Sequence, residues 1–169
     1  MKTLILYSSY DGQTKRIAEF LASKLSSEVE VRSISEQICF DFDRIIIGAS
    51  VRYGYFNKNL YKFIKKNTAL LNSKPSAFFG VNLTARKDDK NTPETNVYVR
   101  KFLQCIAWEP QCSAVFAGAL LYPRYNWFDR MMIKLIMKIT GGETDTDKEI
   151  EYTNWDKVTE FALRVNTLN

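Results

Sequence analysis

Residues 3–14 read TLILYSSYDGQT, and they decide the fold of this chain of 169 residues. The apolar run Leu4–Tyr7 is typical of a buried strand, and it leads into the polar loop Ser9–Thr14. A helical pattern follows at once, in which Ile17 and Leu21 lie four residues apart. A buried strand, a short polar loop and an amphipathic helix predict the start of a βαβ unit, and hence a parallel sheet.

Strands and helices alternate along the rest of the chain. Val29–Ile34 alternates apolar and polar side chains, as a half-exposed edge strand does. Arg44–Ala49 and Ser76–Val81 are continuous apolar runs typical of buried parallel strands, and a fifth strand is expected at Ala114–Leu120. An edge-type second strand beside buried first and third strands fits the doubly wound order 2-1-3-4-5. We therefore expect a single α/β domain over residues 1–169, built on a five-stranded parallel sheet.

Three further helices are expected between and after these strands. Leu60, Ile64 and Leu71 give the first one an apolar side. The second is expected to open at Thr92–Glu94, which supplies a cap, a proline at the first helical position and an acid in the first turn. The last is expected to start at the capping-box-like segment Thr153–Asp156.

The composition excludes several kinds of active site. The chain has no histidine, which rules out Ser-His-Asp and Cys-His nucleophilic sites and His-ligated zinc or haem. Its three cysteines, Cys39, Cys105 and Cys112, fit neither a disulfide framework nor a CxxC metal site, so inert thiols and no metal are expected. Any difficult chemistry is therefore expected to rest on an organic cofactor.

The first loop has the features of an anion cradle. Ser9 and Thr14 carry hydroxyls, Gly12 permits a close approach or a positive φ, and the loop ends at a helix amino terminus. It lacks the ending of a P-loop and the three glycines of a dinucleotide fingerprint. A polar turn that only caps the helix is the alternative. The loop resembles the S-x-T-G-x-T phosphate loop of flavodoxins, which implies an FMN phosphate held by Ser9, Tyr10, Asp11, Gly12, Gln13 and Thr14.

Two later strand ends would complete a flavin site of that kind. The third strand runs into a loop at the position where flavodoxins stack an aromatic ring on the flavin. Tyr53 is expected in that role and Tyr55 is the second choice, with surface tyrosines beside a turn as the alternative. The expected cofactor contacts of these two loops are Ser50, Val51, Arg52, Tyr53, Gly54, Asn82, Leu83 and Thr84.

The loop after the fourth strand is basic, because it carries Arg86 and Lys87 where flavodoxins have acidic residues. Positive charge stabilises a reduced, anionic flavin and raises its potential. We therefore expect a flavin that takes electrons from a substrate and passes them to a quinone. Two merely solvated cations are the alternative.

The segment Tyr122–Asp147 interrupts the path from the fifth strand to the last helix, and it is predicted to be an insertion containing a basic amphipathic helix. Three cations recur every four residues and line one stripe of this helix: Arg130, Lys134 and Lys138. Apolar side chains cover the rest. We expect a membrane interface, with Trp127 and Tyr125 at headgroup depth. A helix packed on the sheet or a subunit interface is the alternative.

Segments spread over nearly the whole chain are similar to one family. They are DGQT at 11–14, IGAS at 47–50, RYG at 52–54, NL at 82–83, ARK at 85–87, RKF at 100–102, GAL at 118–120, YPRY at 122–125, Trp127, MIKLIMK at 132–138 and GGETDT at 141–146. The chain resembles the bacterial flavodoxin-like, quinone-dependent protoporphyrinogen IX dehydrogenases. The insertion segments are the most specific, because ordinary flavodoxins lack them.

The resemblance implies an FMN-dependent oxidoreductase of haem biosynthesis, bound peripherally at the cytoplasmic face of the bacterial inner membrane. Protoporphyrinogen IX would lose six electrons in three two-electron steps, and menaquinone or ubiquinone would accept them. No catalytic side chain is expected, because the chemistry lies on the FMN. The candidate partners of the two propionates are Arg52, Arg86, Lys87, Arg124 and Arg130. The wider set expected to meet substrate or membrane is Arg86, Lys87, Arg124, Trp127, Arg130, Lys134 and Lys138.

Other classes of protein fit the residues less well. An electron-transfer flavodoxin predicts an acidic surface, and the net charge of +5 counts against it. An NAD(P)H:quinone reductase needs a nicotinamide site, for which no motif is found. A receiver-type signalling domain needs acidic residues where this chain has Ser8-Ser9 and Ser50-Val51. No helix-turn-helix, RRM or zinc pattern accompanies the positive charge, so no nucleic acid is expected.

Overall fold

Five strands form a parallel sheet in the order β2-β1-β3-β5-β6 in the computed structural model, which describes residues 1–169. The strands are β1 (Lys2–Ser8), β2 (Glu28–Ser33), β3 (Arg44–Arg52), β5 (Ser76–Asn82) and β6 (Cys112–Ala117). All four pairings are parallel, and the order is the expected 2-1-3-4-5 order with β2 at one edge. The carboxyl ends of the strands therefore meet at one end of the sheet, where such folds bind their ligands.

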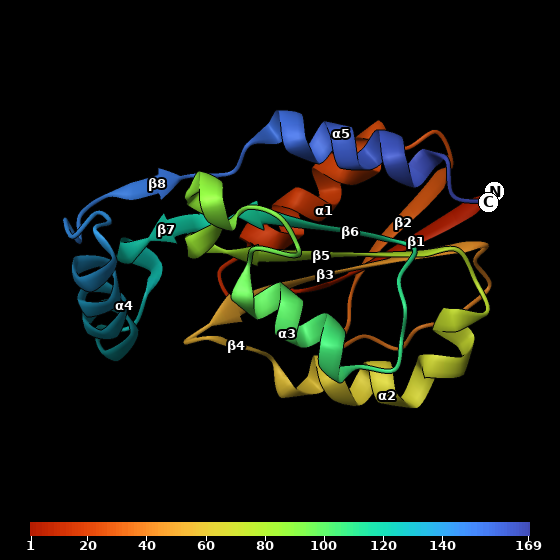
Figure 1. Ribbon diagram of the computed structural model, residues 1–169, viewed down its shortest axis with the longest axis horizontal. Coiled ribbons are helices and arrows are strands. Elements are labelled where there is room, and N and C mark those ends of the chain that lie inside the picture. The colour runs from red at the N-terminus through yellow and green to blue at the C-terminus, as the bar shows by residue number, and fades with distance from the viewer.

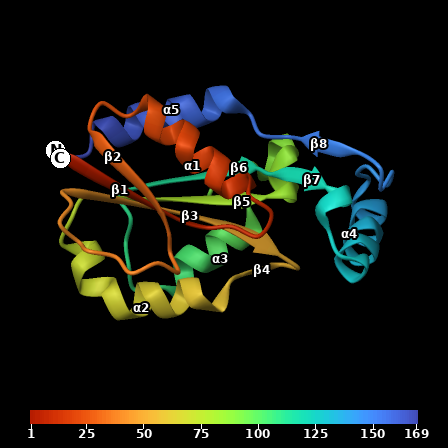
Figure 2. The same cartoon turned by 180° about the vertical axis from the view of Figure 1, so that it is seen from behind.

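Helices cover both faces of this sheet (Figures 1 and 2). One face carries α1 (Gln13–Lys24) and α5 (Trp155–Asn166), and the other carries α2 (Lys58–Asn72) and α3 (Val97–Cys105). Both faces of the central strands are thus buried, which explains why their sequences are continuous apolar runs rather than alternating ones. The two chain termini lie together at the end opposite the strand carboxyl ends.

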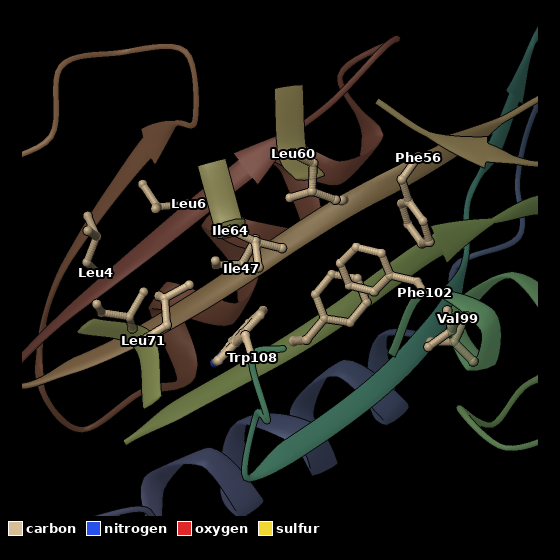
Figure 3. Close-up of a cluster of buried hydrophobic side chains, with 14 of the residues drawn as sticks. Leu4, Leu6, Ile47, Phe56, Leu60, Ile64, Leu71, Val99, Phe102 and Trp108 are labelled. Carbon is tan, nitrogen blue, oxygen red and sulfur yellow. The ribbon is translucent and has the colours of Figure 1, made fainter. Parts of the chain in front are cut away.

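Aliphatic and aromatic side chains together fill the core between the sheet and α2 and α3 (Figure 3). The rings of Phe78 and Phe102 are stacked with their centroids 4.6 Å apart, and Trp108 meets Phe78 edge-on at 6.2 Å. The buried indole N–H of Trp108 donates to Ser76 Oγ at 2.9 Å, so its polar group is satisfied. This packing fixes β5, and with it the loop that β5 delivers to the ligand end of the sheet.

One predicted helix start is wrong, and one predicted helix cap is displaced by one residue. The helix expected to open at Thr92–Glu94 begins at Val97, because the Thr92 and Thr95 hydroxyls close a separate turn and Asn96 is the cap. The last helix is capped by Asn154 and not by Thr153. The Thr153 hydroxyl donates to a β6 carbonyl instead, at 2.7 Å.

The predicted fifth strand is wrong at its carboxyl end. After Gly118 the chain leaves the parallel sheet, and β7 (Ala119–Leu121) pairs antiparallel with β8 (Glu149–Glu151). Between them lie a short 3-10 turn and α4 (Trp127–Thr140), which the two strands carry beyond the end of the sheet (Figure 1). The insertion thus has its own two-stranded stem and exceeds the predicted 122–147. None of the helices is long and apolar enough to span a membrane.

Candidate functional site

A cavity of about 460 Å³ lies at the carboxyl ends of the strands, with α4 as one wall. Fourteen of the residues expected from the sequence line it: Ser9, Tyr10, Asp11, Gln13, Thr14, Ser50, Val51, Arg52, Tyr53, Gly54, Asn82, Leu83, Thr84 and Arg86. A second concavity, of about 590 Å³, runs along the edge strand β2, but charged and polar side chains make up most of its lining. The cavity beside α4 is the candidate site, because a helix amino terminus and an apolar wall meet there.

The loop between β1 and α1 is built to receive an anion. Gly12 lies immediately before α1 with φ +95°, a conformation that a side chain at this position would make costly, and its N–H donates to Ser9 Oγ at 3.0 Å. Thr14 is fully buried, lines the cavity, and its Oγ1 has no hydrogen-bond partner. A buried hydroxyl without a partner is costly unless a ligand satisfies it, so this loop fits a phosphate group. The Gln13 side chain is turned aside, since its amide donates to Thr153 Oγ1 at 3.0 Å.

The expected stacking residue lies in a tight hairpin that the sequence did not predict. β3 turns back as β4 (Tyr55–Phe56), and the loop between them is Tyr53 and Gly54 alone. Both have positive φ, 53° and 84°, and Tyr53 is the single non-glycine residue of the chain with that backbone. Tyr53 lines the cavity, whereas Tyr55 is 75% exposed and does not. The structure therefore favours Tyr53 over Tyr55 for a ring at this site.

Arg52 joins the first loop, the hairpin and α4. Its guanidinium pairs with the carboxylates of Asp11 and Asp129, and its side chain is only 14% exposed. Burial alone would lower the pKa of Arg52, but these two carboxylates raise it above the ordinary value. Its Cζ also lies over three rings: Tyr10 at 4.9 Å, Tyr125 at 5.3 Å and Tyr53 at 6.0 Å. Arg52 is thus fixed within the protein and has little freedom to meet a substrate.

The loop after β5 continues as the 3-10 turn η1 (Leu83–Arg86). Asn82 closes it: its Oδ1 accepts from the Ala85 N–H at 3.0 Å, and its amide pairs with that of Asn96. The Asn82 side chain therefore has its hydrogen bonds within the protein, and its backbone carbonyl accepts from the Gly118 N–H at 3.2 Å. Arg86 lines the cavity and donates to the Leu83 carbonyl at 2.8 Å.

α4 presents different faces to the cavity and to solvent. Five of its residues line the cavity, although the sequence assigned none of them to the cofactor site: Met132, Ile133, Ile136, Met137 and Thr140. The four-residue spacing of Met132, Ile136 and Thr140 was the available signal. The outward face carries exposed apolar side chains: Trp127, Phe128, Met131, Leu135 and Ile139. The other lining residues, none of which was predicted to contact the cofactor, are Val81, Tyr98, Gly118, Ala119 and Tyr125.

The remaining predicted residues lie outside the cavity lining, and two of them have partners elsewhere. Arg124 pairs with Glu149 at 2.8 Å, at the end of the stem that carries α4. Arg130 donates to the carbonyls of Tyr122 and Tyr125 at 3.2 and 3.3 Å. Lys87 is half-buried, while Trp127, Lys134 and Lys138 are exposed. Tyr125 does not lie at the surface as predicted: it is 6% exposed, and its hydroxyl accepts from the Leu121 N–H.

No cluster of three or more cysteine, aspartate or glutamate side chains is arranged to hold a metal ion. All three cysteines are free thiols, with Cys112 buried and Cys39 and Cys105 exposed. The chemistry that the cavity offers is therefore that of a bound organic ligand with a phosphate at the first loop, an aromatic ring at the hairpin and an apolar wall at α4.

Comparisons with known proteins agree with this geometry. The family described as flavodoxin domain matches residues 4–147. Protoporphyrinogen IX dehydrogenase (quinone) of Escherichia coli K12 is 53% identical over 171 residues, which cover 98% of this chain and 94% of that protein. The protein of the same name from Leishmania major is 50% identical over 168 residues, 95% of this chain and 73% of its own length.

Two solved structures show the same fold at low sequence identity. Flavodoxin 1 from Bacillus cereus superposes with a TM-score of 0.59 at 18% identity, and the match covers all of both chains. A flavodoxin from the domain Archaea gives 0.54 at 17% identity, over 98% of this chain and 96% of that one.

Proposed function

This chain belongs to the quinone-dependent protoporphyrinogen IX dehydrogenases of the flavodoxin-domain family, and from that premise we propose that it works through an FMN bound in the cavity beside α4. It is an oxidoreductase that oxidises protoporphyrinogen IX with a quinone as electron acceptor, a step of haem biosynthesis. The cofactor is a flavin, in keeping with the flavodoxin domain.

The observation that carries the FMN proposal is the unpartnered, fully buried hydroxyl of Thr14 in the loop before α1. FMN differs from riboflavin in its phosphate, and this loop suits a phosphate. The loop Ser9–Thr14 would hold that phosphate, Tyr53 would lie against the ring, and the segment Asn82–Thr84 would border its other side. The bound flavin supplies the two-electron chemistry, so three turnovers remove the six electrons.

The chain's own residues bind the two apolar substrates, the porphyrinogen and the quinone, and exclude water. Met132, Ile136 and Met137 make the α4 wall of the cavity apolar. Arg86 uses two of its nitrogens in bonds to backbone carbonyls and keeps further N–H groups for an acceptor. Of the five candidate propionate partners, Arg52 and Arg124 are paired with carboxylates, and Arg130 lies outside the cavity lining with its guanidinium on two backbone carbonyls. Arg86 lines the cavity and has no carboxylate partner, so we assign the propionates of the porphyrinogen to Arg86 and its neighbour Lys87.

We further propose that α4 seats the protein peripherally on the cytoplasmic face of the bacterial inner membrane. Its outward face exposes Trp127 by 74% and Ile139 by 77%. The helix has one acidic residue, Asp129, and its carboxylate is used internally by Arg52. Lys134 and Lys138 are exposed, so the outer surface of α4 is apolar and cationic, as suits anionic lipid.

Turnover under anaerobic conditions tests the activity. FMN-loaded protein is mixed with protoporphyrinogen IX, and protoporphyrin fluorescence is followed with and without menaquinone or ubiquinone. Porphyrin is expected only when a quinone is present. If no porphyrin forms with menaquinone or with ubiquinone, the assigned activity is wrong. If the protein turns over equally well with riboflavin in place of FMN, the proposed choice of cofactor is wrong.

Neither rival function is favoured. An electron-transfer flavodoxin has no substrate of its own, whereas relatives 50–53% identical to this chain are named as dehydrogenases of protoporphyrinogen IX. The apolar wall that α4 adds to the cavity also has no use in a carrier that only meets protein partners. An NAD(P)H:quinone reductase finds no support in those names.

A further inference from the structure

We propose that Asp129, in the first turn of α4, is a positioning residue of the flavin site: its carboxylate clamps the Tyr53–Gly54 turn so that the Tyr53 ring is presented to the cavity. The proposal rests on the proposed function only for the identity of the ligand. The clamp itself is a property of the protein chain and can be tested without flavin.

The turn is unusual for its residue type. A two-residue hairpin loop with positive φ at both positions is a type I′ arrangement, in which asparagine or glycine is preferred at the first position. Here that position holds Tyr53, a bulky residue for which φ +53° carries a backbone cost. Such strain persists only where surrounding contacts over-determine it, so the turn needs a partner that holds it.

α4 supplies that partner. The Tyr53 hydroxyl donates to Asp129 Oδ1, and Arg52 Nη1 lies 3.3 Å from Oδ2. Both carboxylate oxygens therefore bind the same hairpin, one at the turn and one at the residue before it. The Asp129 side chain is only 23% exposed, which protects these contacts from competition by water.

The position of Asp129 is itself fixed by the start of α4. Its backbone N–H donates to Oδ1 of the helix cap Asn126 at 2.8 Å. An acid in the first turn is also favoured by the helix dipole. The clamp thus joins a rigid helix end to a strained turn 76 residues earlier in the chain.

The protonation state of Tyr53 suits the clamp. Desolvation and the hydrogen bond to Asp129 raise the pKa of Tyr53 to about 12, so the hydroxyl remains a donor at neutral pH. The hydroxyl is tethered at the edge of the ring and Arg52 lies over one face, so the opposite face is the one available for stacking.

A simpler reading is that Asp129 only stabilises the start of α4, and the chain offers a matched control for it. Asp156 occupies the first turn of α5, follows the cap Asn154, and is exposed. Asp156 therefore shares the capping and dipole environment of Asp129, but its carboxylate contacts no hairpin. Four variants separate the two readings: Asp129→Ala, Tyr53→Phe, the double variant, and Asp156→Ala.

Dissociation constants for FMN and riboflavin are measured by flavin fluorescence, together with the visible circular dichroism of the bound flavin. Asp129→Ala and Tyr53→Phe are each expected to raise the dissociation constants of both FMN and riboflavin about tenfold. Both variants are also expected to change the circular dichroism of the bound flavin in the same way. The double variant is expected to bind flavin no more weakly than Asp129→Ala alone, because Asp129→Ala already removes the contact that Tyr53→Phe removes. Asp156→Ala is expected to match the wild type.

The proposal would be overturned if Asp129→Ala kept the flavin affinity and the circular dichroism spectrum of the wild type. It would also be overturned if the double variant lost affinity by the product of the two single losses. Amide hydrogen exchange across Arg52–Phe56 in the flavin-free protein supplies the second readout. Asp129→Ala is expected to accelerate exchange there and Asp156→Ala is not. A wild-type protein that binds no flavin would contradict the proposed function, whereas unchanged exchange in Asp129→Ala would contradict the clamp.

Discussion

The guanidinium of Arg86 lies with Nη2 3.3 Å from the carbonyl oxygen of Thr140, which joins the loop after β5 to the last turn of α4. A second nitrogen of the same group donates to the Leu83 carbonyl. Arg86 lines the cavity as well, so a positive charge is held there by two backbone acceptors rather than by a carboxylate. Its charge is therefore not cancelled locally and acts on whatever the cavity binds.

This charge is expected to set the potential of the bound flavin. Arg86→Gln removes a cation that stabilises the reduced, anionic form. Loss of about 1.4 kcal/mol of that stabilisation lowers a two-electron midpoint potential by about 30 mV. A redox titration of the FMN-loaded protein against dyes of known potential measures the shift. Lys101→Gln, an exposed cation on α3 outside the cavity lining, is the control and should leave the potential unchanged. A potential unaltered by Arg86→Gln would contradict the electrostatic role.

The Thr14 hydroxyl is expected to serve ligand binding and not folding. Thr14→Val removes a buried polar atom that has no partner, so the unfolding free energy of the flavin-free protein should stay constant or rise by about 1 kcal/mol. The dissociation constant for FMN should rise about tenfold, while that for riboflavin, which lacks the phosphate, should not change. Urea unfolding and fluorescence titration measure the two effects.

Thr3→Val is the matched control for this prediction. Thr3 is equally buried, but its Oγ1 accepts from Arg44 Nε at 3.0 Å. Valine there leaves a buried charged donor short of a partner, so a loss of about 1–3 kcal/mol of stability is expected, with FMN affinity unaltered. If Thr14→Val destabilised the flavin-free protein as much as Thr3→Val, the hydroxyl would have a structural role instead.

The outward face of α4 is expected to drive membrane binding. Leu135→Gln with Ile139→Gln replaces two exposed apolar side chains without touching the cavity lining. Binding to vesicles that contain anionic lipid should fall by at least about tenfold, because less apolar surface enters the interface. Sedimentation with sucrose-loaded vesicles measures the partition. Lys134→Gln with Lys138→Gln should weaken binding to anionic vesicles by about 1 kcal/mol per lysine and leave neutral ones unaffected.

Leu163 provides the control for the apolar face. It is 61% exposed on α5, on the body of the protein, so Leu163→Gln should not change the partition. Equal binding of the wild type and the Leu135/Ile139 variant would show that α4 does not meet lipid.

Tyr122 is expected to make stability fall at alkaline pH. It is fully buried, donates to the Glu143 carbonyl at 2.7 Å, and burial raises its pKa to about 12. The folded state thus holds this proton more tightly than the unfolded chain, whose tyrosines titrate near the ordinary value of about 10. The contribution is complete below pH 10 and is lost as the pH rises through about 12.

Urea unfolding at a series of pH values measures this effect. Tyr122→Phe should lower stability at neutral pH and flatten the decline between about pH 10 and 12. Tyr55→Phe is the control, because Tyr55 is exposed, and it should decline as the wild type does. An identical alkaline slope in Tyr122→Phe would mean that another group causes the decline.

Local patterns were enough for the body of the fold. The continuous apolar runs Arg44–Ala49 and Ser76–Val81 and the alternating run Val29–Ile34 give the strand order, because burial on one or two faces is written into each strand separately. A parallel sheet brings its strand ends together, which placed the first and third loops at one site, and the resemblance to flavodoxins implied the roles of the phosphate loop and Tyr53. The stem β7–β8 could not be predicted in this way, because a three-residue strand has too few positions to show a period.

The contacts of the arginine side chains could not be predicted from the sequence. Arg52, Arg86, Arg124 and Arg130 are chemically equal along the chain, and each was a candidate for a propionate. The tertiary structure separates them by the acceptor within reach: carboxylates for Arg52 and Arg124, carbonyls for Arg86 and Arg130. Only the first and second of these line the cavity.

The sequence by itself determined the sheet order and the family, because these depend on residue type and on spacings along the chain. Through its resemblance to flavodoxins it also predicted the phosphate loop and the ring at Tyr53. Only the tertiary structure decided that Asp129 holds Tyr53, that Tyr125 is buried beneath Arg52, and that α4 closes the cavity. The physical reason is range: periodicity reports the burial of each element, whereas a hydrogen bond or ion pair depends on which distant side chain the fold brings within about 3 Å.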